Sequence, residues 1–186
     1  MDIKDVVVKR FNELEHLPKR KSTRLKGYDY STPGAYFITM CVKDRKELLS
    51  KIIVGTGVLD CPQNILTPYG EIANKHLVNM SNFYENVKIH KFVVMPNHIH
   101  MLIQILESNN QNGPSGTPVP TNSLIAQFVS TFKRFCNKEY GENIWQTRSN
   151  DHIIRGEKDY QKIWEYIDTN IVRWEKDCFY NSETEQ

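Results

Sequence analysis

The chain has 186 residues, of which 39% are hydrophobic and 25% are charged, as in an ordinary globular protein with enough residues for its own core. Its formal net charge of +2 allows nucleic-acid binding without demanding it. Four scattered cysteines with no C-x-x-C pair argue against a zinc knuckle or a disulfide framework. No apolar run approaches the roughly 20 residues that span a bilayer, so we expect a cytoplasmic protein with no membrane partner.

The N-terminal part is rich in positive charge. Residues 3–17 have the apolar spacing of a short helix, and the segment 19–26 that follows is too poor in apolar residues to pack as an element. This basic segment fits a solvated linker and a phosphate-binding arm equally well. Tyr28 and Tyr30, in the turn-forming segment 27–34, are compatible with either a nucleic-acid surface or ordinary packing.

The middle of the chain alternates between strand-like and helix-like patterns. Runs of β-branched and aromatic residues predict strands, and apolar residues three and four apart predict a helix. The expected elements are a strand over 35–42, a second strand around 51–55, a loop over 60–68, an amphipathic helix over 69–84, and a hairpin of strands 87–94 and 98–106.

A polar stretch over residues 107–123 is expected to be a flexible linker before a helical C-terminal part. Beyond it, Ser123 can cap a helix with an apolar stripe from Leu124 to Cys136. Residues 144–155 are expected to form a turn and a short extended piece, and a last helix is expected over 157–174. The fold class predicted from this order is α+β, a mostly antiparallel sheet with helices on one face.

The hairpin carries the first candidate site. His98 and His100 open its second strand, where residues two apart point to the same side, so their imidazoles would project together and can hold a metal ion. Pro96 marks the strand boundary, and strand ends are where sites usually lie. The spacing also fits a pair that faces solvent and has no role.

The last predicted helix carries the second candidate site. Tyr166 and Asn170 are four residues apart and therefore share one helix face, beside the apolar stripe. Taken alone, each is an ordinary helix-surface or core residue.

Together, these motifs resemble the single-tyrosine HUH transposases, and most closely the REP-associated tyrosine transposases of bacteria. The resemblance covers residues 22–177 and depends on the order and spacing of several short motifs. They are Arg24-Leu25-Lys26-Gly27-Tyr28-Asp29-Tyr30, Gly34-Ala35-Tyr36-Phe37-Ile38-Thr39, Met95-Pro96-Asn97-His98-Ile99-His100, Phe132-Lys133, Trp145-Gln146, Asp151-His152-Ile153-Ile154-Arg155, and Tyr166-Ile167-x-x-Asn170. One departure is Ile171, where the family commonly has proline.

The resemblance implies a ferredoxin-like antiparallel sheet and a metal-dependent transposase. It implies that His98 and His100 bind Mg²⁺ or Mn²⁺, that Tyr166 is the nucleophile, and that Asn170 is a third metal ligand. The partner would be single-stranded DNA at a hairpin or REP-like palindrome. We further expect a single transposase domain over residues 1–186, with an N-terminal extension over 1–18 and a basic arm over 19–33. The protein would act at the bacterial nucleoid. A homodimer is compatible with the resemblance.

The candidates for DNA contact combine basic residues with one tyrosine. They are Lys19, Arg20, Lys21, Arg24, Lys26, Tyr28, Lys133, Arg134 and Arg155. Two other functions remain open on the sequence alone: a hairpin-binding protein that no longer cuts DNA, and a metal-dependent hydrolase in which water attacks and Tyr166 is structural.

Overall fold

The computed structural model describes residues 24–25, 27–53, 61–107 and 123–180. The helix expected over 3–17, residues 19–23 and 26 of the basic arm, and residues 108–122 of the linker lie outside these ranges. None of the described helices combines the length and the apolar character that crossing a bilayer requires.

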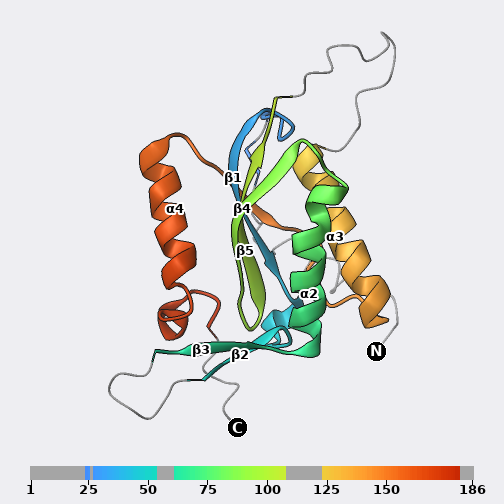
Figure 1. Cartoon of the computed structure of the whole chain (residues 1–186), viewed down its shortest axis with the longest axis vertical. Coiled ribbons are helices and arrows are strands. Elements are labelled where there is room, and N and C mark those ends of the chain that lie inside the picture. Colours follow the sequence, from blue (N-terminus) through green and yellow to red (C-terminus); the bar gives the residue numbers. More distant parts are fainter. Residues whose placement is uncertain (1–23, 26, 54–60, 108–122, 181–186) are drawn as a thin grey trace, which may run out of the picture.

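Four antiparallel strands form the main sheet, in the order β4-β5-β1-β6 (Figure 1). Their bounds are Gly34–Cys41 for β1, Val87–Val94 for β4, His98–Ile105 for β5 and Asn150–Ile153 for β6. The α+β class and the hairpin are confirmed, because β4 and β5 pair directly on either side of Pro96. Since β5 and β1 are the two central strands, residues on them are held by neighbours on both sides.

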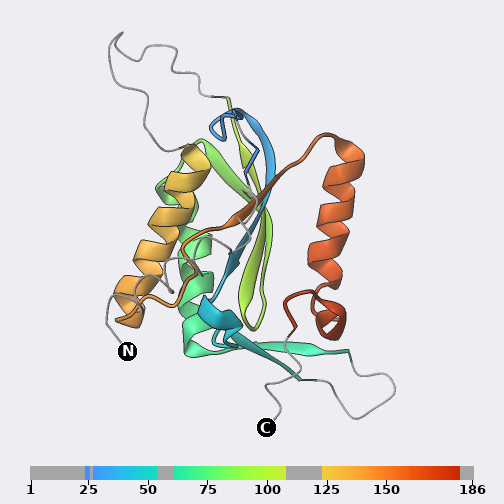
Figure 2. The same cartoon turned by 180° about the vertical axis from the view of Figure 1, so that it is seen from behind.

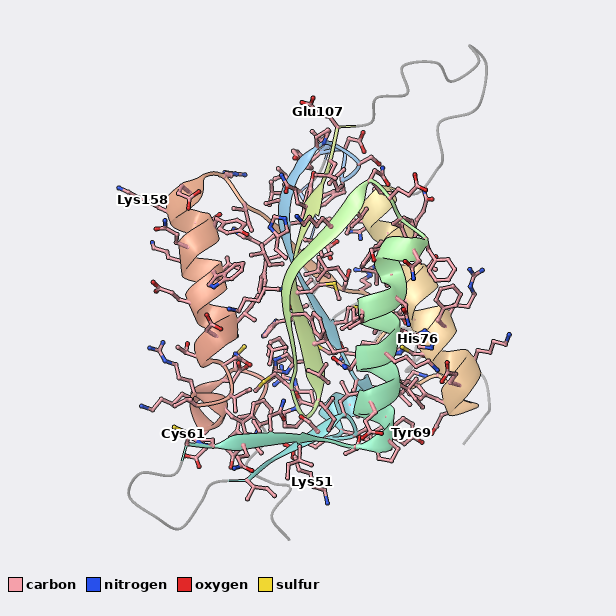
Figure 3. The ribbon with its side chains drawn as sticks, in the orientation of Figure 1. Lys51, Cys61, Tyr69, His76, Glu107 and Lys158 are labelled. Carbon is pink, nitrogen blue, oxygen red and sulfur yellow. The ribbon has the colours of Figure 1, made fainter. Side chains whose placement is uncertain are left out.

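One face of the sheet is covered by two helices, α2 (Pro68–Asn79) and α3 (Leu124–Tyr140), which the opposite view also shows together (Figure 2). Helix α3 begins as the sequence predicts, since the Ser123 side chain accepts from Ala126 N–H at 3.3 Å. Helix α2 begins one residue before the expected position, and the Thr67 side chain caps it by accepting from Gly70 N–H at 3.2 Å. Tyr69 and His76 on α2 face α3 (Figure 3), where their rings contact Tyr140 and Phe135.

Helix α4 (Glu157–Thr169) packs on the opposite face of the sheet, so the expectation that helices cover one face was wrong (Figure 1). The reason is that β5 is buried on both of its sides. Ile99 and Met101 point into the core beneath α2 and α3, while His98, His100 and Leu102 point to the other side, where Leu102 joins a second cluster with Ile167. A strand that is buried on both sides needs cover on both.

Helix α4 also ends five residues before the predicted end at Trp174, because the helical hydrogen bonds stop near Asn170. Residues 170–173 form turns, and a short 3₁₀ helix follows at Trp174–Lys176. Trp174 is 7% exposed within the cluster beneath α4. The chain therefore folds back along α4 instead of continuing away from the sheet.

The loop expected over 60–68 contains a strand that the sequence analysis missed. Strand β3 (Gln63–Leu66) pairs with β2 (Ser50–Ile53) in a separate two-stranded sheet. The strand begins with two polar residues, so its sequence lacks the apolar pattern that predicts a strand. A tertiary contact helps to stabilise it, since Asn64 Nδ2 donates to the Val94 carbonyl at 2.7 Å.

The first turn of α2 lies against the backbone of Leu49, and Gly70 makes this approach possible. A Cβ at Gly70 would stand 1.9 Å from the Leu49 carbonyl oxygen. We expect Gly70→Ala to lower the free energy of unfolding by about 2 kcal/mol or more, because backbone must move to relieve the overlap.

Urea unfolding followed by circular dichroism measures this effect. Val78→Ala, at an exposed position of the same helix, is the matched control and should change stability by less than about 0.5 kcal/mol. Equal losses in the two variants would contradict the close approach.

Candidate functional site

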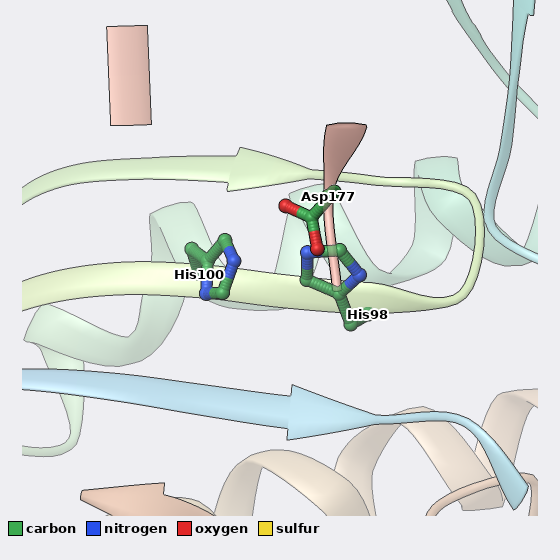
Figure 4. Close-up of side chains that lie close together, drawn as sticks. All are labelled: His98, His100 and Asp177. Atoms are coloured by element: carbon green, nitrogen blue, oxygen red, sulfur yellow. The ribbon is translucent and has the colours of Figure 1, made fainter. Parts of the chain in front are cut away.

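The two histidines lie at the start of β5, on the sheet face that α4 covers. His98 is 0% exposed and His100 is 1% exposed, and their ring centroids are 4.3 Å apart (Figure 4). The expectation that the imidazoles project side by side is confirmed. The alternative of a solvent-facing pair is excluded by their burial.

Asn97, in the hairpin turn, sets the orientation of His98. Its Nδ2 donates to the backbone carbonyls of Phe179 at 2.8 Å and Arg45 at 3.3 Å, so its Oδ1 is left to accept from His98 Nδ1 at 2.8 Å. This places the imidazole proton on Nδ1. His98 Nε2 then carries the lone pair, and it is buried with no hydrogen-bond partner among the described residues.

His100 connects the strand to Tyr166 on α4. Its Nδ1 lies 2.8 Å from Thr39 Oγ1, and its Nε2 lies 3.2 Å from Tyr166 Oη. Because the Thr39 hydroxyl can donate or accept, it is compatible with either tautomer of His100. Tyr166 thus meets the histidine pair within a single chain.

The third group at the site is Asp177, which the sequence analysis did not identify. Its Oδ2 accepts from Tyr166 Oη at 3.0 Å, and its Oδ1 accepts from Phe179 N–H at 2.8 Å. His98, His100 and Asp177 each offer one atom able to bind a metal, and these atoms lie within 4.8 Å of one another (Figure 4). No sequence motif indicates Asp177, because it reaches the histidines only through the turns that follow α4.

Asn170 is buried beside this cluster, with 1% exposure. Its Nδ2 donates to Asp177 Oδ2 at 2.9 Å, and its Oδ1 has no hydrogen-bond partner among the described residues. Asn170 therefore contacts the site through Asp177, and its side chain also acts on Tyr166, where it opposes the rise in the phenol pKa that burial causes.

Burial decides the charge on the two histidines. It lowers the pKa of His98 to about 4, and it lowers the pKa of His100 well below its ordinary value, with the positive charge of His98 acting in the same direction. Both imidazoles are therefore neutral near pH 7, which is the form that binds a metal.

The acidic and phenolic groups complete the electrostatics of the site. Burial opposes ionisation of Asp177, but hydrogen bonds from Phe179 N–H and Asn170 outweigh it and hold the carboxyl pKa below its usual range. Burial and the charge of Asp177 both raise the pKa of Tyr166. Without a bound cation, the site thus holds neutral histidines, a carboxylate and a protonated tyrosine.

Several residues expected to contact DNA have partners inside the fold. Arg24 Nε donates to Asp151 Oδ2 at 2.6 Å, and the Tyr28 hydroxyl lies 3.3 Å from that of Tyr36. Lys133 Nζ donates to the Gln146 carbonyl at 2.6 Å. None of these contacts removes the residue from a surface, so their DNA roles stay predictions.

The other residues expected to contact DNA have fewer contacts within the fold in the contacts described, or lie outside the described residues. The guanidinium of Arg134 is 5.6 Å from the Phe135 ring centroid, and Arg155 donates only its backbone N–H to Asp159 in the contacts described. Lys19, Arg20, Lys21 and Lys26 lie outside the described ranges.

No protein-family model matches the chain. An uncharacterized protein of Haemophilus influenzae is 36% identical over 174 residues, covering 87% of this chain and 93% of that protein. A second protein of the same organism, named "Putative REP-associated tyrosine transposase", is 26% identical over 154 residues, or 78% of this chain and 74% of that protein.

A solved structure of a REP-associated tyrosine transposase bound to a REP hairpin has the same fold. Its TM-score is 0.57 at 21% sequence identity, and the match covers 81% of this chain and 73% of that one.

The buried histidines make stability depend on pH. The pKa of His98 falls from 6.5 to about 4 on folding, so the unfolded chain binds the proton more readily. The free energy of unfolding should therefore drop by on the order of 3 kcal/mol through this residue as the pH falls from about 6.5 to about 4.

Urea unfolding in a chelating buffer across this pH range measures the effect. His98→Gln should show a shallower loss of stability with falling pH than the natural chain, whatever its stability at neutral pH. Equal slopes would show that His98 does not titrate as a buried neutral group.

Proposed function

We propose that the chain is a REP-associated tyrosine transposase, as its 26% identity to a protein of that name supports, and that it cuts and rejoins single-stranded DNA beside hairpins. In this proposal Tyr166 is the nucleophile and a divalent ion binds at His98 and His100. The observation that carries it is the Tyr166 hydroxyl, whose oxygen lies 3.2 Å from His100 Nε2. A nucleophile beside two neutral imidazoles and a carboxylate is the arrangement that metal-assisted attack on a phosphodiester requires.

One structural observation supports a divalent ion at these residues. His98 Nε2 is buried, holds a lone pair and has no hydrogen-bond partner among the described residues, although buried polar atoms are normally paired. Imidazole suits Mn²⁺ better than Mg²⁺, so Mn²⁺ is the chemically easier fit. The family resemblance by itself points to Asn170 as a third ligand, and Asp177 is a second candidate for that place. When bound, the ion offsets the negative charge of the scissile phosphate and polarises its phosphorus.

Tyr166 supplies the attacking oxygen. Its Oη forms a bond to phosphorus while the bond from phosphorus to the 3′ oxygen breaks, which leaves a 5′-phosphotyrosine and a free 3′-OH. The phenol proton leaves and the departing 3′ oxygen takes up a proton. Asp177 Oδ2 already accepts the hydrogen bond from Tyr166, so it is the nearest acceptor for the phenol proton.

The link to Tyr166 conserves the energy of the phosphodiester. A phenolate is a better leaving group than an alkoxide, since its conjugate acid has a pKa near 10. A 3′-OH on another DNA end can therefore attack the phosphotyrosine and rejoin the strand without ATP.

The DNA partner follows from the family and from charge. A related protein has been solved with a REP hairpin, and we propose the same class of DNA for this chain. Lys133, Arg134 and Arg155 are proposed to contact the phosphate backbone, together with the basic arm over 19–33. Such contacts position DNA without selecting its sequence.

The test is adduct formation. The full chain with Mn²⁺ and labelled single-stranded hairpin DNA should give a covalent protein–DNA band on a denaturing gel, and Tyr166→Phe should lower this band at least about 10³-fold, because the nucleophilic oxygen is gone. Candidate hairpins come from the neighbourhood of the gene.

The matched control is Tyr160→Phe. Tyr160 lies on the same helix, but its hydroxyl is 2.7 Å from His90 Nδ1 and outside the site, so this variant should keep the adduct. Cleavage by Tyr166→Phe without an adduct would instead indicate attack by water, and binding of hairpins without cleavage by the natural chain would indicate a binding protein.

A further inference from the structure

The carboxylate of Asp177 is the one acidic side chain that the described residues bring to the histidine pair. We infer that Asp177 is the third protein ligand of the divalent ion at His98 and His100, and that Asn170 positions its carboxylate. This inference rests on the metal site of the proposed function and names a ligand that the sequence motifs do not contain.

The donor set favours the carboxylate over the amide. Two imidazoles and one carboxylate leave open positions for phosphate oxygens, and they bring a full negative charge to a divalent cation. A neutral amide brings only a dipole. Oδ2 of Asp177 already accepts two hydrogen bonds, from Tyr166 and Asn170, whereas Oδ1 accepts one, from Phe179 N–H, and keeps a lone-pair site for a cation.

The orientation of the Asn170 amide also supports Asp177 as the ligand. Its Nδ2 donates to Asp177 Oδ2 at 2.9 Å. Because an amide's nitrogen and oxygen diverge from a common carbon, the Asn170 oxygen is turned away from that carboxylate oxygen. If the amide were reversed, two acceptor oxygens would face each other. Asn170 is therefore built to hold Asp177, as the hydrogen-bonding partners of metal ligands commonly do.

Contacts outside the carboxylate hold the segment that carries Asp177. The Phe179 carbonyl accepts from Asn97, and the Phe179 ring lies over His98 with a centroid distance of 4.5 Å. Trp174 packs beneath α4, with its ring centroid 5.9 Å from that of His98. Asp177 is thus anchored from both sides, which reduces the entropy lost when it binds an ion.

The first experiment measures Mn²⁺ binding by the full chain without DNA, using the EPR signal of free Mn²⁺. Asp177→Asn should weaken binding by about tenfold or more, and Asn170→Ala by less than Asp177→Asn, because the ligand itself is kept. Glu175→Gln removes the same charge from an exposed position two residues away and should leave the affinity within about twofold. His98→Ala should abolish binding.

The outcomes separate this inference from the proposed function. Loss of Mn²⁺ binding in His98→Ala and Asn170→Ala, but not in Asp177→Asn, would overturn Asp177 as ligand and leave the tyrosine chemistry standing. A natural chain that forms the Tyr166 adduct but binds no Mn²⁺ at the histidines would overturn both the inference and the metal site.

A second measurement does not depend on whether Asp177→Asn folds. The natural chain labelled with ¹³C at its aspartate carboxyl carbons is loaded with Mn²⁺ and studied by pulsed EPR. A strong ¹³C coupling beside the ¹⁴N couplings of histidine is expected. Histidine couplings without the ¹³C coupling would overturn the inference.

Discussion

The site depends on the hydrogen bonds of one buried amide, that of Asn97. Its two N–H bonds are directed to backbone carbonyls of Arg45 and Phe179, on segments before and after the hairpin, and its oxygen is directed to His98. A single side chain therefore joins the hairpin turn, the 3₁₀ turn Lys43–Arg45 and the C-terminal segment. Since the bond to His98 is buried and the other two are partly buried, losing the amide would leave several polar groups unpaired at once. The turn thus fixes both the fold near the site and the tautomer of His98.

Burial shifts the pKa of the two histidines and that of Tyr166, the proposed nucleophile, in opposite directions. Burial keeps His98 and His100 neutral, as a metal ligand must be, but it also keeps Tyr166 protonated, and the charge of Asp177 strengthens that effect. A phenol in this state is a weak nucleophile. In the proposed function, a cation beside the same groups would lower the pKa of Tyr166 and leave the imidazoles neutral.

The sequence predicted the parts of the site that local geometry controls. The alternation of strand side chains brought His98 and His100 together, and helical spacing placed Tyr166 and Asn170 on one face of α4. It did not predict Asp177, because the chain turns back toward the sheet after Thr169 only when Trp174 packs into the cluster beneath α4. The same limit hid strand β3 and the position of α4, since the residue pattern of a strand such as β5 does not say which face of the sheet each helix will cover.

The unpaired nitrogen of His98 and the carboxylate of Asp177 carry a free-energy cost that a cation, if bound as proposed, would offset. An unpaired buried acceptor such as His98 Nε2 costs about 1–3 kcal/mol, and the nearby carboxylate adds the cost of removing a charge from water. Packing alone could have filled the same volume with apolar side chains at less expense. An ion bound between His98 and Asp177 would satisfy the nitrogen and neutralise the carboxylate in one step.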